Sequence, residues 1–92
     1  MLRLGRRRRT PRLDIAWYPN DTGHPRLGVV VPRYGSTAVA RNRLRRRLRE
    51  IARRSVLPGL SALDLVVRPR PDAYRSPFEE LAEDLETWRR SL

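Results

Sequence analysis

Six arginines fall within nine residues, at positions 41–49, without interrupting an apolar helical repeat. An α-helix turns by about 100° per residue, so one stripe of this segment carries Ala40, Leu44, Leu48 and Ile51. Arginines flank that stripe and cover the opposite side: Arg41, Arg43, Arg45, Arg46, Arg47, Arg49 and Arg54. A solubilising face would alternate acidic and basic residues, yet the helix offers only Glu50. The segment therefore predicts a helix with a narrow buried stripe and a surface suited to a polyanion.

The composition of the whole chain agrees with this interpretation. The 92 residues carry 21 basic and 10 acidic side chains, a net charge of +11, and every basic residue is arginine. The absence of cysteine excludes disulfides and thiolate metal sites. No apolar run approaches the roughly 20 residues of a membrane span, and no secretory signal follows the basic N-terminus. We expect a single-domain cytoplasmic protein that contacts nucleic acid and no membrane.

Three apolar segments predict strands around this helix. Residues 13–18 alternate imperfectly, residues 27–31 are almost wholly apolar, and residues 63–68 are rich in Val and Leu. The turn-rich residues 19–25 predict that the first two strands form an antiparallel hairpin, with 27–31 central or buried on both faces. The order β–β–α–β–α predicts a small two-layer α+β sandwich over residues 13–92, preceded by a basic arm at 1–12.

Local signals also predict where the helices begin and end. Ser36 or Thr37 is a suitable N-cap for the arginine-rich helix, which should end before Pro58-Gly59. A second helix should start at Ser76 as N-cap, with Pro77 at N1 and a capping box closed by Glu79. Its apolar face would pack on the core, and its acidic residues would point away from RNA: Glu79, Glu80, Glu83, Asp84 and Glu86.

Aromatic side chains outside the core are candidates for stacking on bases. Trp17 and Tyr18 are neighbours on a predicted strand, so they should point to opposite faces. Tyr34 precedes the arginine-rich helix and is expected to be exposed, whereas Trp88 is expected in the core. The alternative for Trp17 and Tyr18 is partial burial in the core. His24, the one histidine, is expected to be a solvated loop residue.

Three other classes of protein were weighed. A nuclease acting without RNA would have to use Asp14, Asp64 and Asp72, which are scattered and lack a metal-ligand spacing. A DNA-binding regulator would need a helix-turn-helix or a dimerisation heptad, and neither is visible. A small ribosomal or RNA-assembly protein would have a similar charge and fold, and it remains the main alternative.

Residues 38–50 closely resemble the signature helix of the bacterial ribonuclease P protein subunit. Residues 25–31 and 63–69 are similar to the strands before and after that helix in this family, and residues 78–81 to its closing helix. The resemblance covers about residues 13–90. It implies an α+β sandwich similar to the second domain of ribosomal protein S5, with the arginine-rich helix in a crossover between strands.

The resemblance also implies a function. The family is the accessory subunit of an endoribonuclease that removes the 5′ leader from precursor tRNA, with the chemistry in the RNA subunit and its Mg²⁺ ions. It implies contact with ribonuclease P RNA through Arg41, Asn42, Arg43, Arg45, Arg46 and Arg49. The leader of precursor tRNA would contact Trp17, Tyr18, Arg33 and Tyr34. No catalytic or metal-ligating residue, firmly bound cofactor or small-molecule substrate is expected for the chain itself.

Two departures from the family pattern qualify these expectations. The family begins with a helix before its first strand, and here only residues 1–10 are available for it. In the family, that helix and the sheet form the cleft for the leader, so leader binding is less well supported than binding to the RNA subunit. The loop at residues 35–39 is one residue longer than the usual spacing, which a loop can absorb.

Overall fold

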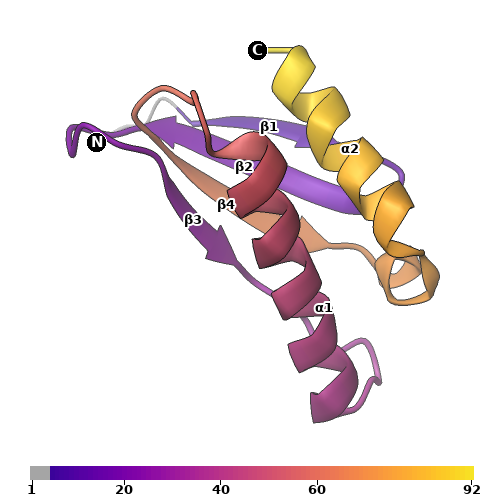
Figure 1. Ribbon diagram of the computed structural model, residues 1–92. Coiled ribbons are helices and arrows are strands. Elements are labelled where there is room, and N and C mark those ends of the chain that lie inside the picture. The colour runs from indigo at the N-terminus through magenta and orange to yellow at the C-terminus, as the bar shows by residue number, and fades with distance from the viewer. Residues whose placement is uncertain (1–4) are drawn as a thin grey trace.

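The computed structural model describes residues 5–92 as one four-stranded sheet covered by helices (Figure 1). The strands occur in the spatial order β1-β2-β4-β3. Their bounds are Arg6–Arg9 for β1, Leu13–Pro19 for β2, Arg26–Val29 for β3 and Leu63–Pro69 for β4. The predicted α+β sandwich is confirmed.

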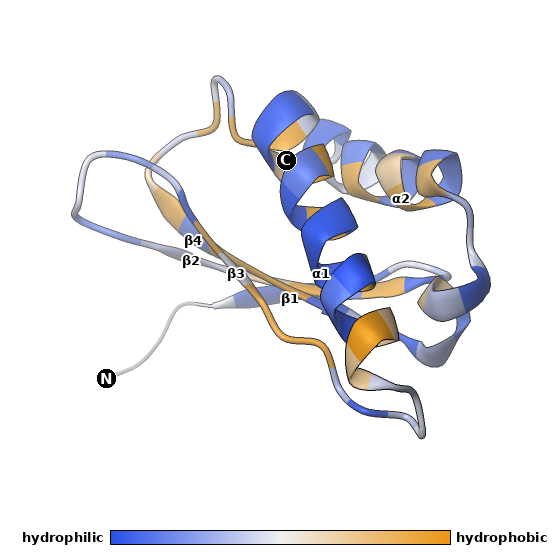
Figure 2. Cartoon of the chain, turned by 60° about the horizontal axis from the view of Figure 1, so that its bottom comes forward, coloured by the Kyte–Doolittle hydropathy of each residue, from blue (hydrophilic) through white to orange (hydrophobic). Residues whose placement is uncertain are grey.

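Two helices lie over one face of the sheet (Figure 2), and no helix within residues 5–92 lies on the other, which we call the uncovered face. Helix α1 (Ala38–Ile51) is followed by a π-helical turn, η1 (Ala52–Val56), and α2 (Phe78–Arg90) follows a 3₁₀ turn, η2 (Pro71–Arg75). The helical segment thus ends before Pro58, as the sequence predicts. None of the helices within residues 5–92 combines the length and apolarity needed to cross a membrane.

The predicted antiparallel hairpin of residues 13–18 and 27–31, which correspond to β2 and β3, is wrong. β4 lies between them, antiparallel to β2 from Leu13↔Pro69 to Pro19↔Leu63, and parallel to β3. In this central position β4 forms ladder hydrogen bonds with β2 and with β3. A hairpin of β2 and β3 would leave one edge of β4 unpaired. β3 becomes an edge strand, and α1 is the crossover that a parallel β3–β4 pair requires. The apolar run at 27–31 is neither central nor buried on both faces, because β3 is at the sheet edge and its residues are exposed or half-buried.

The sheet also contains a strand that the predicted order β–β–α–β–α lacks. Within the predicted basic arm, Arg6–Arg9 pair antiparallel with β2, from Arg6↔Trp17 to Arg9↔Asp14. All four arginines are exposed. An edge strand needs only backbone pairing on one side, so it can form without the apolar alternation on which the prediction relied. The first four residues of the predicted arm lie outside the described residues.

The core lies between the sheet and the two helices. Alternate residues of β2 and β4 point into it, as the period of a strand requires. The fully or almost fully buried side chains include Leu13, Ile15, Leu44, Leu48, Ile51, Leu65, Val67, Leu81, Leu85 and Trp88. The stripe predicted for α1 and the burial of Trp88 are thereby confirmed.

The predicted capping box at Ser76 is wrong. The N-cap of α2 is Pro77, which makes no side-chain cap hydrogen bond. Ser76 is instead the C-cap residue of η2, and its hydroxyl donates to the carbonyl oxygen of Asp72 at 2.8 Å. The hydroxyl is therefore engaged by the preceding turn and does not cap the helix that follows.

Candidate nucleic-acid interface

The start of α1 is fixed by its own loop. Thr37 is the N-cap, and its side chain accepts a hydrogen bond from the backbone N–H of Ala40 at 3.1 Å. Before it, the backbone N–H of Ser36 donates to the carbonyl oxygen of Arg33 at 2.7 Å. Arg41 then donates from Nη1 to the carbonyl oxygen of Ser36 at 3.0 Å. These contacts tie the first turn of the helix to the loop.

The outer side of α1 is a dense basic surface. The predicted contact residues Asn42, Arg43, Arg46 and Arg49 are exposed, and Arg41 and Arg45 are half-buried at its sides. Within residues 5–92, none of these arginines forms an ion pair, and the nearest pair along the chain joins Arg54 to Glu50 at 3.5 Å. The structure therefore brings the six predicted contact residues onto one helix, with their charge uncompensated. We call them the α1 arginine surface.

Asn42 has a defined orientation within this surface. Arg45 donates from Nη1 to Asn42 Oδ1 at 2.8 Å. The amide oxygen of Asn42 is thus used inside the protein, which leaves its Nδ2 group to donate to an outside acceptor. A phosphate or a base edge is an acceptor of this kind.

The residues predicted to contact a leader do not lie together. Trp17 points toward the helices and packs edge-on against Trp88, with 5.3 Å between ring centroids. Tyr18 lies on the opposite, uncovered face of the sheet, as strand alternation predicts. Arg33 and Tyr34 are exposed in the loop after β3. His24 is exposed in the β2–β3 loop, as predicted.

Tyr18 lines a shallow hollow of about 420 Å³ on the uncovered face, between β1, β2 and β4. Arg7 and Arg68 line the same hollow and form no ion pair within residues 5–92, whereas Arg9 pairs with Asp14 at 3.0 Å. Arg7 and Arg68 were not predicted as site residues, because the arginines of β1 lack the pattern of a strand and residues 63–68 were predicted only as an apolar strand. The alternation of β4 was the available signal, since it places Arg68 on the face opposite Val67.

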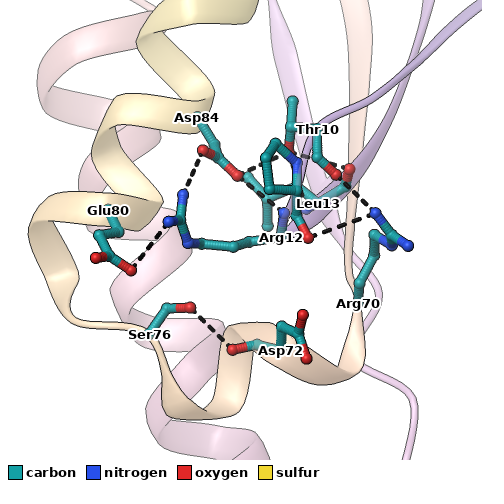
Figure 3. A network of polar contacts seen from close by, with 9 residues as sticks. Thr10, Arg12, Leu13, Arg70, Asp72, Ser76, Glu80 and Asp84 are labelled. Carbon is teal, nitrogen blue, oxygen red and sulfur yellow. Dashed lines mark hydrogen bonds and ion pairs between the residues drawn. The ribbon is translucent and has the colours of Figure 1, made fainter.

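A polar network joins the β1–β2 turn to α2 (Figure 3). Asp84 is 4% exposed and accepts hydrogen bonds from Thr10 Oγ1 at 2.8 Å and from Arg12 Nη1 at 2.8 Å. Arg12 also contacts Glu80 at 3.1 Å, and Arg70 donates to the carbonyl oxygen of Thr10 at 3.0 Å. The prediction that Asp84 belongs to the solvated acidic face is therefore wrong. Its carboxylate is buried because it holds the end of the arginine strand against α2.

A second ion pair lies at the other edge of the sheet. Arg26 on β3 donates from Nε and Nη2 to both carboxylate oxygens of Asp64, at 2.7 and 2.8 Å. Asn20 Nδ2 donates to the same carboxylate at 2.9 Å. The hydrogen bonds from Arg26, and then that from Asn20, lower the pKa of Asp64 to about 2. This pair links the short strand β3 to the central strand.

The three carboxylates considered for a protein nuclease are separated. Asp14 pairs with Arg9, Asp64 pairs with Arg26, and Asp72 lies in η2. In the register of the β2–β4 pair, Asp14 lies opposite Arg68 and Asp64 lies opposite Tyr18, so the two aspartates are at opposite ends of that pair. No group of three or more histidine, cysteine or acidic residues suited to a metal ion occurs within residues 5–92.

Fold and surface together define a class: small, strongly basic α+β sandwiches whose crossover helix carries a polycationic outer side. Comparison with known proteins is more specific. The family model described as Ribonuclease P matches residues 1–92. The chain therefore belongs to the family of bacterial ribonuclease P protein subunits.

Individual relatives support this assignment. The chain is 42% identical over 84 residues to the ribonuclease P protein component of Thermus scotoductus, covering 91% of this chain and 49% of the relative. It is 45% identical over 65 residues to that of Kocuria rhizophila, covering 70% and 58%. The chain thus spans only about half the length of these relatives. The RNase P protein of Thermotoga maritima superposes with a TM-score of 0.84 at 29% identity, covering 96% of this chain and 84% of that one.

Proposed function

We propose that the chain binds ribonuclease P RNA through the α1 arginine surface and helps that RNA to remove the 5′ leader from precursor tRNA. The observation that carries the proposal is the uncompensated charge on α1, together with membership of the family. A helix with exposed arginines on its outer side suits an RNA, because each guanidinium can fork onto a phosphate. Asn42 adds a directed donor among these arginines.

The division of labour follows from the side chains available. Phosphodiester cleavage with metal ions requires closely spaced oxygen ligands. The carboxylates of Asp14, Asp64 and Asp84 are instead paired with arginines. This supports a role in which the RNA subunit holds Mg²⁺ and supplies the chemistry, while the protein neutralises phosphates and positions RNA. Such a subunit would act in the cytoplasm, where precursor tRNA is processed.

The leader of precursor tRNA is proposed to lie along the uncovered face of the sheet. The hollow there offers the ring of Tyr18 for stacking and the guanidinium groups of Arg7 and Arg68 for phosphates. Trp17 is an unsuitable partner for the same strand of RNA, because its ring packs against Trp88 on the helix side. Arg7 and Arg68 therefore replace Trp17 in the leader-binding proposal.

Reconstitution tests the function. The chain is mixed with the ribonuclease P RNA of the same source at low Mg²⁺, and cleavage of precursor tRNA is measured. We expect the protein to raise the rate, and the triple variant Arg43→Gln/Arg46→Gln/Arg49→Gln to lose the effect. The slope of log binding constant against log salt should fall by about 0.7–0.9 for each phosphate contact removed.

A double variant outside α1, compared with the equally charged double variant Arg43→Gln/Arg46→Gln, separates specific contacts from general charge. Arg75 and Arg90 are exposed outside α1, and Arg75→Gln/Arg90→Gln should retain most of the stimulation. A protein that leaves cleavage unchanged contradicts the proposal. Co-purification with ribosomal particles, and not with ribonuclease P RNA, would support the alternative of a ribosomal or assembly protein.

A further inference from the structure

Tyr34 has an unusual backbone for a bulky residue. Its φ is +45°, in the left-handed region, and Gly35 follows with φ of +74°. Glycine adopts this region freely, whereas a large side chain there is strained. Tyr34 nevertheless remains 45% exposed as a residue, so burial in the core does not account for this backbone conformation. Strained residues that surrounding structure holds in place are concentrated at functional sites.

Neighbouring groups hold the exposed ring in position. Tyr34 lies edge-to-face with Tyr74 of η2, with 6.4 Å between ring centroids and 87° between the ring planes. Tyr74 donates its hydroxyl hydrogen to the carbonyl oxygen of Pro32 at 2.9 Å, which ties η2 to the same loop. In an edge-to-face pair, at least one face of each ring is left uncovered by the other. Tyr74 therefore supports the Tyr34 ring and leaves at least one of its faces open on that side.

Tyr74 links the Tyr34 ring to the α1 arginine surface. Tyr74, on which the ring rests, lines a small hollow of about 60 Å³ together with Ala40, Arg43 and Arg47. Arg41 binds the carbonyl oxygen of Ser36, two residues from Tyr34. Residues 30–49 include seven arginines and no acidic residue. The loop that carries Tyr34 therefore leads directly into the arginine-rich helix and is tied to it through Tyr74 and Ser36.

We propose that Tyr34 stacks on an unpaired base of the RNA that binds the α1 arginine surface. The inference rests on the proposed function, and it assigns Tyr34 to the RNA subunit and not to the leader. Two observations favour this assignment. Tyr34 does not line the hollow that contains Tyr18, and its loop follows β3, at the sheet edge opposite β1. Stacking on a base would add a contact that phosphate binding alone does not provide.

The backbone conformation makes a discriminating test possible. Tyr34→Gly removes the ring and relieves the left-handed strain, so the folded chain is retained. We expect this variant to bind ribonuclease P RNA about 5- to 150-fold more weakly, the range for loss of one stacked base. Its salt slope should match that of the unmodified protein, because no phosphate contact is lost. Tyr34→Phe keeps the ring and should restore the affinity.

The measurement is equilibrium binding of the RNA at several salt concentrations, with the thermal midpoint of each variant measured in parallel. If Tyr34→Gly binds as tightly as the unmodified protein, the stacking proposal is overturned. A weaker affinity accompanied by a reduced salt slope overturns it as well, since that would indicate displaced arginines. Arg46→Gln should lower the slope. If Arg46→Gln and the triple arginine variant also bind normally, it is the proposed function that fails.

Discussion

One buried carboxylate, that of Asp84, joins two parts of the molecule that are far apart in sequence. It accepts hydrogen bonds from Thr10 and Arg12 across more than seventy positions of the chain. A charge at 4% exposure is tolerated only where partners replace the water it has lost. These partners belong to the turn that leads from β1 into β2. The orientation of the arginine strand therefore depends on a residue in the last helix.

Asp84→Ala is expected to lower the free energy of unfolding by about 2–4 kcal/mol, because it leaves Thr10 and the Arg12 guanidinium without their acceptor. Denaturation by urea measures the loss. Glu80→Gln is the matched control, since Glu80 meets the same guanidinium while its side chain is 47% exposed. It should cost at most about 1 kcal/mol. Equal losses in the two variants would contradict the role given to Asp84.

The Arg26–Asp64 pair predicts a dependence of stability on pH. The pKa of Asp64 falls from its ordinary 3.8 to about 2 in the folded chain. A carboxylate whose pKa is lower in the folded state stabilises the protein at every pH above its unfolded-state pKa. This stabilisation is lost as the pH falls from about 4 to about 2. Asp64→Asn should therefore flatten the decline of the unfolding midpoint over that window. Arg26→Gln should flatten it similarly, and a wild-type profile in either variant would disprove the assignment.

At the level of elements, the helices and the sheet offer RNA two separate surfaces. Helix α1 lies over the covered face of the sheet (Figure 2), and its Arg43, Arg46 and Arg49 are exposed. Arg7 and Arg68 lie with Tyr18 on the uncovered face. Side chains on opposite faces of a sheet cannot contact one short RNA segment together. The two surfaces should therefore be separable by mutation.

Arg7→Gln/Arg68→Gln is expected to weaken binding of precursor tRNA by the reconstituted enzyme, while its affinity for mature tRNA, which has no leader, stays unchanged. The salt slope for precursor tRNA should fall by about 0.7 for each lost contact with a single strand. Arg75→Gln/Arg90→Gln again serves as the charge-matched control. Equal weakening for precursor and mature tRNA would argue against a leader on the sheet.

The sequence predicted some elements much better than others, for physical reasons. Helix α1 carries a regular apolar repeat and a Thr37 N-cap, both local signals that the structure confirms. Strand β1 carries neither, since its residues bury no side chain and pair only through the backbone. The position of β4 was also missed, because strand pairing depends on contacts between distant parts of the chain. The capping box predicted at Ser76 failed for a similar reason, since the Ser76 hydroxyl donates its hydrogen bond to the preceding turn.

The same reasons apply to the candidate site. The arginines of α1 were found because charge and helical period are visible in one segment. The hollow lined by Tyr18 could not be predicted from the sequence, because Arg7 and Arg68 come together only when β2 lies between β1 and β4. The left-handed backbone of Tyr34 was also hidden, since the neighbouring Gly35 is the residue expected to adopt it.

For the molecule as a whole, the central position of β4 has a consequence for how the chain folds. β4 is the last strand in sequence, and both β2 and β3 pair with it. Before residues 63–69 leave the ribosome, the described strands can form only the β1–β2 hairpin, which is marginal by itself. Collapse of the sheet therefore waits for the final third of the chain. The arginine-rich helix is synthesised before the strand that completes its packing surface, so nascent chains carry it without a finished core.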